Sequence, residues 1–268
     1  MEQVVQAEEL LQQGDLMNSL ERLQQSVRER PADSGLRVFL FQLLCVTGDW
    51  QRAWDQLQLT AELDAINLPM AQTYREAIVC ELFRQQVFAG SQSPLVFGDP
   101  PGWMALLIEA LQMAAGGKHE RARLLQQAAL EQAPAKAGVI DGQAFAWIAD
   151  ADPRIGPVFE AIINGRYYWI PMDRLSGVEL EVPRDLRDMV WAPARLQFEN
   201  GGATVALIPS RYSGTERSDD AALKLARKTL WQEPAPDFFS GLGQRMFVSD
   251  RGDHALLNTR TLRFESIC

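Results

Sequence analysis

The residues best suited to chemistry lie in the second half of the sequence, where charged and aromatic residues are dense. Asp150 and Asp152 are two positions apart, so on a strand both carboxylates would point to the same face. Such a pair could serve general acid–base catalysis or hold a divalent cation. Nearly every acid here, however, has an arginine close in sequence, which is typical of ion pairs and caps that fix loops. We therefore predict a structural ion-pair cluster made of Asp150, Asp152, Arg154, Arg184, Asp185, Arg187, Asp188 and Arg211.

The sequence lacks the motifs of common cofactor-dependent and nucleophilic enzymes. Its two histidines, His119 and His254, have no metal-ligand partners at suitable spacing. Gly241 and Gly243 are not followed by the third glycine of a dinucleotide fingerprint, and no phosphate-binding loop or G-x-S-x-G elbow is present. We expect no cofactor, no metal and no enzymatic activity. The three cysteines, Cys45, Cys80 and Cys268, are expected to be free thiols.

Charge and hydropathy narrow the range of partners. The formal net charge of -9 argues against nucleic acid as a partner. The first residues are acidic where a signal peptide needs a basic region, and the most apolar helical stretch, Trp103 to Ala115, is too short to cross a bilayer. We therefore expect a cytoplasmic protein without a membrane partner.

The first half contains a repeat. Gly14 and Gly48 are 34 residues apart, which is the tetratricopeptide period, and each precedes a small residue by five positions, Ser19 and Ala53. A third copy has its glycine at Gly117. Glycine allows the first helix of a pair to end in a left-handed turn, and the small residue lets the two helices approach closely. Between copies two and three, Pro69 to Phe88 has the pattern of one long helix.

If the copies pack as tetratricopeptide hairpins do, the first helix of each pair lines a concave surface. The side chains expected on that surface are mostly apolar: Val4, Leu11, Val38, Gln42, Met104, Leu107 and Leu111. An apolar groove suits an amphipathic partner helix better than a charged peptide end. The alternative is that the helix from Pro69 to Phe88, or the second half of the chain, already covers this surface.

After about residue 134 the pattern changes to short β-branched and aromatic runs. Strands are predicted at 143–148, 166–171, 177–182, 189–198, 204–209, 228–232, 244–249 and 254–263. Hairpin turns are predicted at Asn200–Gly202 and Asp250–Asp253, and helical insertions at Pro153–Asn164 and Ser218–Arg227. The predicted fold class is α+β. An all-helical tetratricopeptide-like domain, 1–134, precedes a mostly antiparallel β domain, 143–268, which forms a bent sheet or partial barrel with short helices.

Five stretches carry a resemblance to a known family. They are FAWIADADPRIGP from Phe145, GRYYWIP from Gly165, PRDLRDMVW from Pro183, IPSRY from Ile208 and GQR from Gly243. Together they resemble the ImpE, SciE or TagJ family of accessory proteins encoded with bacterial type VI secretion systems. The resemblance covers essentially the whole chain.

The resemblance implies a cytoplasmic, non-enzymatic protein. It implies binding to the small subunit of the contractile sheath, through a helix near that subunit's N-terminus, and an indirect influence on recruitment of the sheath-disassembling AAA+ ATPase. The residues themselves leave two other classes open. One is an enzyme of unknown type that uses Asp150, Asp152 and Asp188. The other is a generic tetratricopeptide adaptor for a peptide terminus, which would need a basic clamp on the groove floor, where neither Lys nor Arg is expected.

Overall fold

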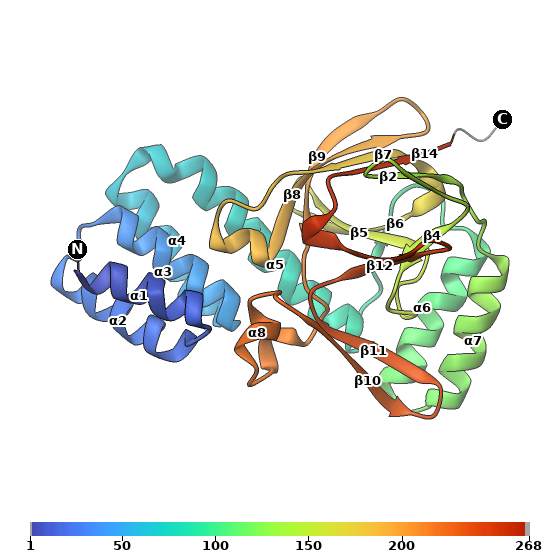
Figure 1. Cartoon of the computed structure of the whole chain (residues 1–268), viewed down its shortest axis with the longest axis horizontal. Helices are drawn as coiled ribbons and strands as arrows, with labels where there is room; N and C mark the ends of the chain where they lie inside the picture. Colours follow the sequence, from blue (N-terminus) through green and yellow to red (C-terminus); the bar gives the residue numbers. More distant parts are fainter. Residues whose placement is uncertain (1, 266–268) are drawn as a thin grey trace.

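The computed structural model describes residues 2–265, and side chains from residue 4 onward. Helices form the first part of the chain and a mostly antiparallel sheet forms most of the second (Figure 1). The predicted α+β class is confirmed, and the sheet does not close into a barrel. Within the described residues, no helix is both long and apolar enough to cross a membrane.

The first two repeats fold as helical hairpins. Gly14 and Gly48 take left-handed conformations, with φ of +84° and +82°, and so end the first helix of each pair. Ser19 and Ala53 are fully buried where the paired helices meet, as the spacing predicts. The helices are α1 (Glu2–Gln13), α2 (Leu16–Glu29), α3 (Ser34–Thr47) and α4 (Trp50–Leu63).

The third hairpin forms but does not extend the first two. It consists of α6 (Gly102–Ala115) and α7 (His119–Gln132), with Gly117 again left-handed at φ +75°. The preceding helix, α5 (Leu68–Phe88), has 21 residues, which at 1.5 Å per residue span about 30 Å. Figure 1 shows α5 running from the α1–α4 hairpins along the sheet toward α6 and α7, and α6 packs on the same face of the sheet as α5. A continuous concave surface over three repeats is therefore not formed.

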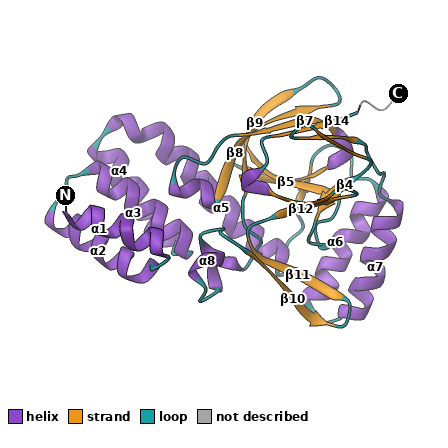
Figure 2. Ribbon diagram, viewed as in Figure 1, coloured by secondary structure: helices purple, strands orange, loops and turns teal. Residues whose placement is uncertain are grey.

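Nine strands make the main sheet, and two smaller sheets flank it (Figure 2). The main order is β1-β6-β5-β9-β8-β7-β14-β2-β3, and within the described residues β1 and β6 pair in parallel while the other neighbours pair antiparallel. Its strands are β1 (Leu95–Val96), β2 (Gly138–Ile140), β3 (Gln143–Phe145), β5 (Val158–Ile163), β6 (Arg166–Pro171), β7 (Leu175–Leu180), β8 (Trp191–Phe198), β9 (Ala203–Pro209) and β14 (Thr261–Phe264). The smaller sheets contain β10 (Thr229–Ala235) with β11 (Phe238–Gly243), and β13 (Gly252–Ala255) with β12 (Met246–Ser249) and β4 (Ile148–Asp150).

Local predictions in this half have mixed outcomes. Both hairpin turns are confirmed, since Asn200–Gly202 joins β8 to β9 and Asp250–Gly252 leads from β12 to β13. The insertion at Ser218–Arg227 is a short helix, α8 (Ala221–Lys224). The helix predicted at Pro153–Asn164 is wrong, because β5 occupies its second half as a strand buried along its whole length. The expectation of no strand before residue 134 is also wrong at β1.

One hydrophobic cluster joins the helices to the sheet. Trp191 lies 5.9 Å from Trp50 and 6.0 Å from Tyr74, measured between ring centroids. Phe88 of α5 lies 6.3 Å from Trp169 of β6 in the same way. These aromatic contacts bury the face of α4 and α5 against the strands. The boundary between two separate domains therefore stays a prediction.

Candidate functional site

The carboxylates of Asp150 and Asp152, the candidates for catalysis or metal binding, are buried and paired with arginines. Asp150 accepts hydrogen bonds from Arg245, Nε at 2.9 Å and Nη2 at 2.7 Å, and from the Tyr212 hydroxyl at 3.0 Å. Burial raises the pKa of Asp150 to about 6, although the charge of Arg245 acts in the opposite direction. Asp152 is paired with Arg154, whose Nε lies 3.0 Å from its Oδ1. Neither side chain has a carboxylate oxygen left for a substrate.

Another buried carboxylate, that of Glu160, lies between α5 and the sheet. Arg84 of α5 donates to Glu160 of β5 from Nε at 2.6 Å and Nη2 at 3.0 Å, and to Glu81 from Nη1 at 3.0 Å. Arg245 reaches the same Glu160 at 3.2 Å, and the Tyr167 hydroxyl also donates to it. Burial alone would raise the pKa of Glu160, but the charges of Arg84 and Arg245 outweigh burial and lower it to about 2. The network holds fixed charges that tie α5 to the sheet.

No metal site emerges from these groups. Across the described part of the chain, no cluster of three or more His, Cys, Asp or Glu side chains is arranged to hold a metal ion. Cys45 and Cys80 are buried and unpaired, and burial raises the pKa of both thiols. Cys268 lies outside the described residues. The arrangement supports structural ion pairing and offers no reactive nucleophile at these positions.

The charged run after Pro183 forms a tight turn that packs against the helices. The turn contains η3 (Leu186–Met189), and the Asp188 carboxylate caps it by accepting the backbone N–H groups of Arg184 at 2.8 Å and Asp185 at 2.9 Å. Arg187 pairs with Asp185, and its guanidinium lies 4.7 Å from the Tyr74 ring centroid. The backbone N–H of Arg187 donates to Gln42 of α3 at 3.3 Å.

Arg211 binds backbone carbonyls instead of a carboxylate. Its guanidinium donates to Val46 at 2.8 Å and Cys45 at 3.3 Å, both in the last turn of α3, and to Lys224 of α8. The predicted cluster is therefore divided among three places: the sheet interior, the η3 turn and the end of α3.

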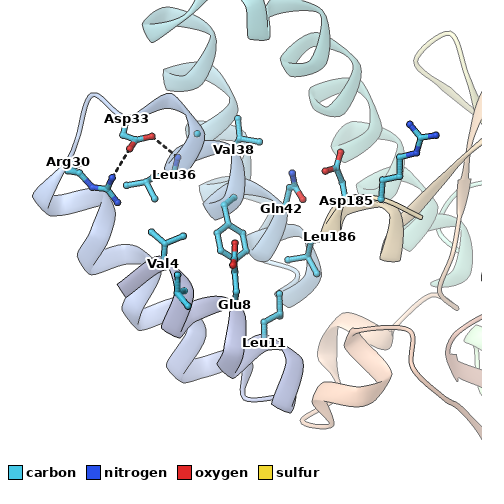
Figure 3. A pocket seen from close by; sticks show the side chains of 14 residues that line it. Val4, Glu8, Leu11, Arg30, Asp33, Leu36, Val38, Gln42, Asp185 and Leu186 are labelled. Atoms are coloured by element: carbon cyan, nitrogen blue, oxygen red, sulfur yellow. Dashed lines mark hydrogen bonds and ion pairs between the residues drawn. The ribbon is translucent and has the colours of Figure 1, made fainter. Parts of the chain in front are cut away.

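An apolar groove lies between α1, α3 and η3, with a volume of about 650 Å³. Four residues predicted for a concave surface line it: Val4, Leu11, Val38 and Gln42 (Figure 3). The three apolar ones are half-buried and so accessible, whereas Gln42 is buried under the η3 turn. Phe39 and Leu186 add apolar lining that the repeat pattern did not indicate. The second half of the chain thus closes one end of the groove and leaves the rest open.

Charged residues line this groove beside the apolar ones, including two arginines. Arg30 is paired with Asp33 at 3.2 Å, and Arg184 lines the end near η3. Glu8 is exposed on α1 beside Val4 and Leu11. The prediction that the floor would lack Lys and Arg concerned α1 and α3, whereas the two arginines of the groove come from the residue after α2 and from the segment before η3.

The other three predicted groove residues are placed elsewhere. Met104, Leu107 and Leu111 lie on α6, are 0%, 0% and 3% exposed, and belong to the hydrophobic core. Placing them on the same surface as Val4 is wrong, because the long helix α5 separates the third hairpin from α1–α4 and their side chains pack into the core. No partner can reach them in the folded protein.

Some important residues were missed by the sequence interpretation. Glu81 and Arg84 stand three positions apart on an otherwise apolar stretch of α5, which is a signal for a buried pair. The other carboxylate that Arg84 binds, Glu160, is 76 positions away in the sequence, and no local pattern connects the two. Leu186 likewise reaches the groove only through the tertiary fold.

Comparisons with known proteins agree with the earlier resemblance. The family model of the ImpE protein matches residues 142–263. A curated relative from Pseudomonas aeruginosa, the type VI secretion system accessory component TagJ, is 51% identical over 261 residues, covering 97% of this chain and 91% of the relative. A crystal structure of a Vibrio parahaemolyticus protein superposes with a TM-score of 0.90 at 24% identity, covering 98% of each chain, and so shares the fold.

Proposed function

Because the chain belongs to the ImpE family, which includes the type VI secretion accessory component TagJ, we propose that it is a non-enzymatic accessory protein of such a system. In this proposal it binds the N-terminal helix of the sheath small subunit in the groove between α1, α3 and η3. The binding in turn influences recruitment of the sheath-disassembling AAA+ ATPase, a step for which the family resemblance is the support. A protein with this role acts in the cytoplasm.

The observation that carries the proposal is the lining of the groove. Val4, Leu11, Val38, Phe39 and Leu186 offer apolar surface in a hollow of about 650 Å³ that remains open in the isolated chain. An amphipathic helix places apolar side chains on one face at i, i+3, i+4 and i+7, which suits such a hollow. Each buried apolar side chain contributes about 1.5 to 3 kcal/mol before the entropic cost of association, so micromolar affinity is reasonable for three or four anchors.

The state of the charged groups favours binding over catalysis. A catalytic carboxylate needs at least one oxygen free to exchange a proton with substrate. Asp150 and Asp152 are 2% and 0% exposed and both are held by arginines. Asp188 is also buried and caps the η3 turn. Asp150, Asp152 and Asp188, the acids of the enzyme hypothesis, thus form ion pairs and a turn cap that stabilise the fold.

A peptide titration tests the groove. We would measure binding of a labelled peptide, taken from the N-terminal helix of the sheath small subunit encoded with this protein, to the wild-type chain and to Val38→Glu. The introduced carboxylate would face the apolar stripe of the peptide, so affinity should fall at least about tenfold. Val205→Glu is the matched control, because Val205 is 75% exposed on β9 and lies away from the groove.

Circular dichroism and thermal melting establish that each variant is folded. Wild-type affinity in a folded Val38→Glu protein would show that the helix binds elsewhere. Absence of binding by the wild-type protein would refute the proposed function itself.

A further inference from the structure

A second hollow continues from the end of the groove. It has a volume of about 700 Å³ and lies among the end of α1, the η3 turn, the segment after α8 and η5 (Leu256–Asn258). Leu11, Arg184, Asp185 and Leu186 line both hollows, so the two adjoin each other at the η3 turn. A chain leaving the groove past η3 would enter this second hollow.

The charge of the second hollow is opposite to that of the whole protein. Three arginines line it, Arg184, Arg227 and Arg260, against one carboxylate, Asp185. Asp185 is already paired with Arg187. The chain as a whole has a formal net charge of -9. The second hollow is therefore a local excess of positive charge on an acidic protein.

The three arginines keep their charge available. Arg227 donates to the backbone carbonyls of Gln12 and Leu11, both at 2.9 Å. Arg260 likewise donates to backbone carbonyls, including that of Glu181 at 3.0 Å. Carbonyl partners position a guanidinium without neutralising it, and each of these side chains retains further N–H donors. Among residues 4–265, none of the three arginines forms an ion pair with a carboxylate.

We propose that this second hollow binds a short acidic peptide segment that directly adjoins the helix held in the groove, an inference that rests on the proposed function. Guanidinium groups fixed by backbone carbonyls are suited to bind carboxylates through paired N–H···O bonds. Leu225, Leu257 and Met189 give the hollow an apolar side as well. This combination fits a peptide better than a nucleic acid, whose continuous phosphate charge the acidic remainder of the protein would repel.

Three labelled peptides test the inference against the full-length protein. The first is the sheath-derived helix with four glutamates appended, the second carries four serines instead, and the third is the glutamate segment alone. Each extension is made at either end of the helix, because the groove does not fix the direction of the peptide. At about 50 mM salt the glutamate extension at one end should tighten binding about tenfold over serine, and the difference should largely vanish at 500 mM salt.

Arginine variants test whether the second hollow causes the tighter binding of the glutamate-extended peptide. Arg184→Gln and Arg227→Gln should each reduce the ratio of glutamate-peptide to serine-peptide affinity several-fold, and this ratio cancels any effect on the groove itself, which Arg184 also lines. Arg184 is the cleaner variant, because its side chain makes no hydrogen bond within the described residues, whereas Arg227 also holds α1. Arg195→Gln is the matched control, since Arg195 is exposed on β8 and does not line the hollow.

The outcomes separate the inference from the proposed function. Equal affinity for the serine and glutamate peptides at both ends would overturn the inference while the groove function stands. Tighter binding that persists in Arg184→Gln and Arg227→Gln would also overturn it. A single-stranded oligonucleotide that binds with the same dependence on these arginines would show a general polyanion site and reject the peptide. If no peptide binds the wild-type protein, the proposed function fails and the inference fails with it.

Discussion

Replacing Arg84 with methionine should destabilise the protein by about 3 to 5 kcal/mol, because it leaves buried carboxylates without their main partner. The guanidinium makes two hydrogen bonds to Glu160 and one to Glu81, and the side chain is 2% exposed. Methionine fills similar volume, so the change removes charge more than packing. Glu160 retains Arg245 at 3.2 Å and the Tyr167 hydroxyl, which places the expected loss nearer the lower value.

Urea denaturation followed by circular dichroism measures this effect as a change in unfolding free energy. Arg75→Met is the matched control, because Arg75 lies on the same helix but is half-buried and forms no ion pair within the described residues. It should cost less than about 1 kcal/mol. The double variant Arg84→Met with Glu160→Gln should be more stable than the sum of the single changes predicts, since it removes one stranded charge. A loss below 1 kcal/mol for Arg84→Met alone would refute the idea that this network holds α5 to the sheet.

Three further changes test other parts of the account. Asp188→Ala removes the cap at the N–H of Arg184 and should cost about 1 to 2 kcal/mol, seen as a melting temperature lower by several degrees. Leu107→Glu should unfold the protein or lower its free energy of unfolding by more than about 3 kcal/mol, because Leu107 is 0% exposed. A folded variant with a wild-type melting temperature would contradict the placement of Leu107 in the core. The pKa of Glu160 is lowered to about 2 from 4.5, so its charged form contributes about 3 kcal/mol that is complete above pH 5 and is lost as pH falls toward 2. Glu160→Gln should therefore flatten the dependence of urea stability on pH between about pH 5 and 3, and an unchanged slope would argue against a charged Glu160.

The sequence was most informative where one residue type is needed by local geometry. Gly14 and Gly48 are required by left-handed helix ends, and Ser19 and Ala53 by close helix packing, so the two hairpins could be predicted from spacing alone. The turn at Asn200–Gly202 could be predicted equally well, because few residue types suit a tight hairpin turn. Each of these features depends on neighbours only a few positions away.

Features set by distant contacts could not be predicted in the same way. β5 carries a nearly continuous apolar run, which periodicity alone cannot separate from a short buried helix, and its strand pairing depends on β6 and β9. The third hairpin has the repeat spacing, but its position depends on the length of α5. Four of the seven residues predicted for the groove therefore line one hollow, and the three on α6 are buried elsewhere.

The groove depends on both halves of the chain, although its two helical walls come from the first. Arg211 donates to carbonyls in the last turn of α3, and Arg227 donates to those of α1. A cation at a helix C-terminus is favourable because the unpaired carbonyls there carry partial negative charge. The η3 turn closes one end of the groove through Leu186.

These contacts indicate what the part of the chain matched by the family model contributes to the groove. Residues 142–263 include η3, Arg211 and Arg227, while α1 and α3 lie outside the match. The matched half thus contains the groups that fix the helices and close one end of the groove, together with the three arginines of the adjoining hollow. On the proposed function, the sheet domain is part of the binding surface, and a change at Arg211 should alter peptide affinity through the position of α3.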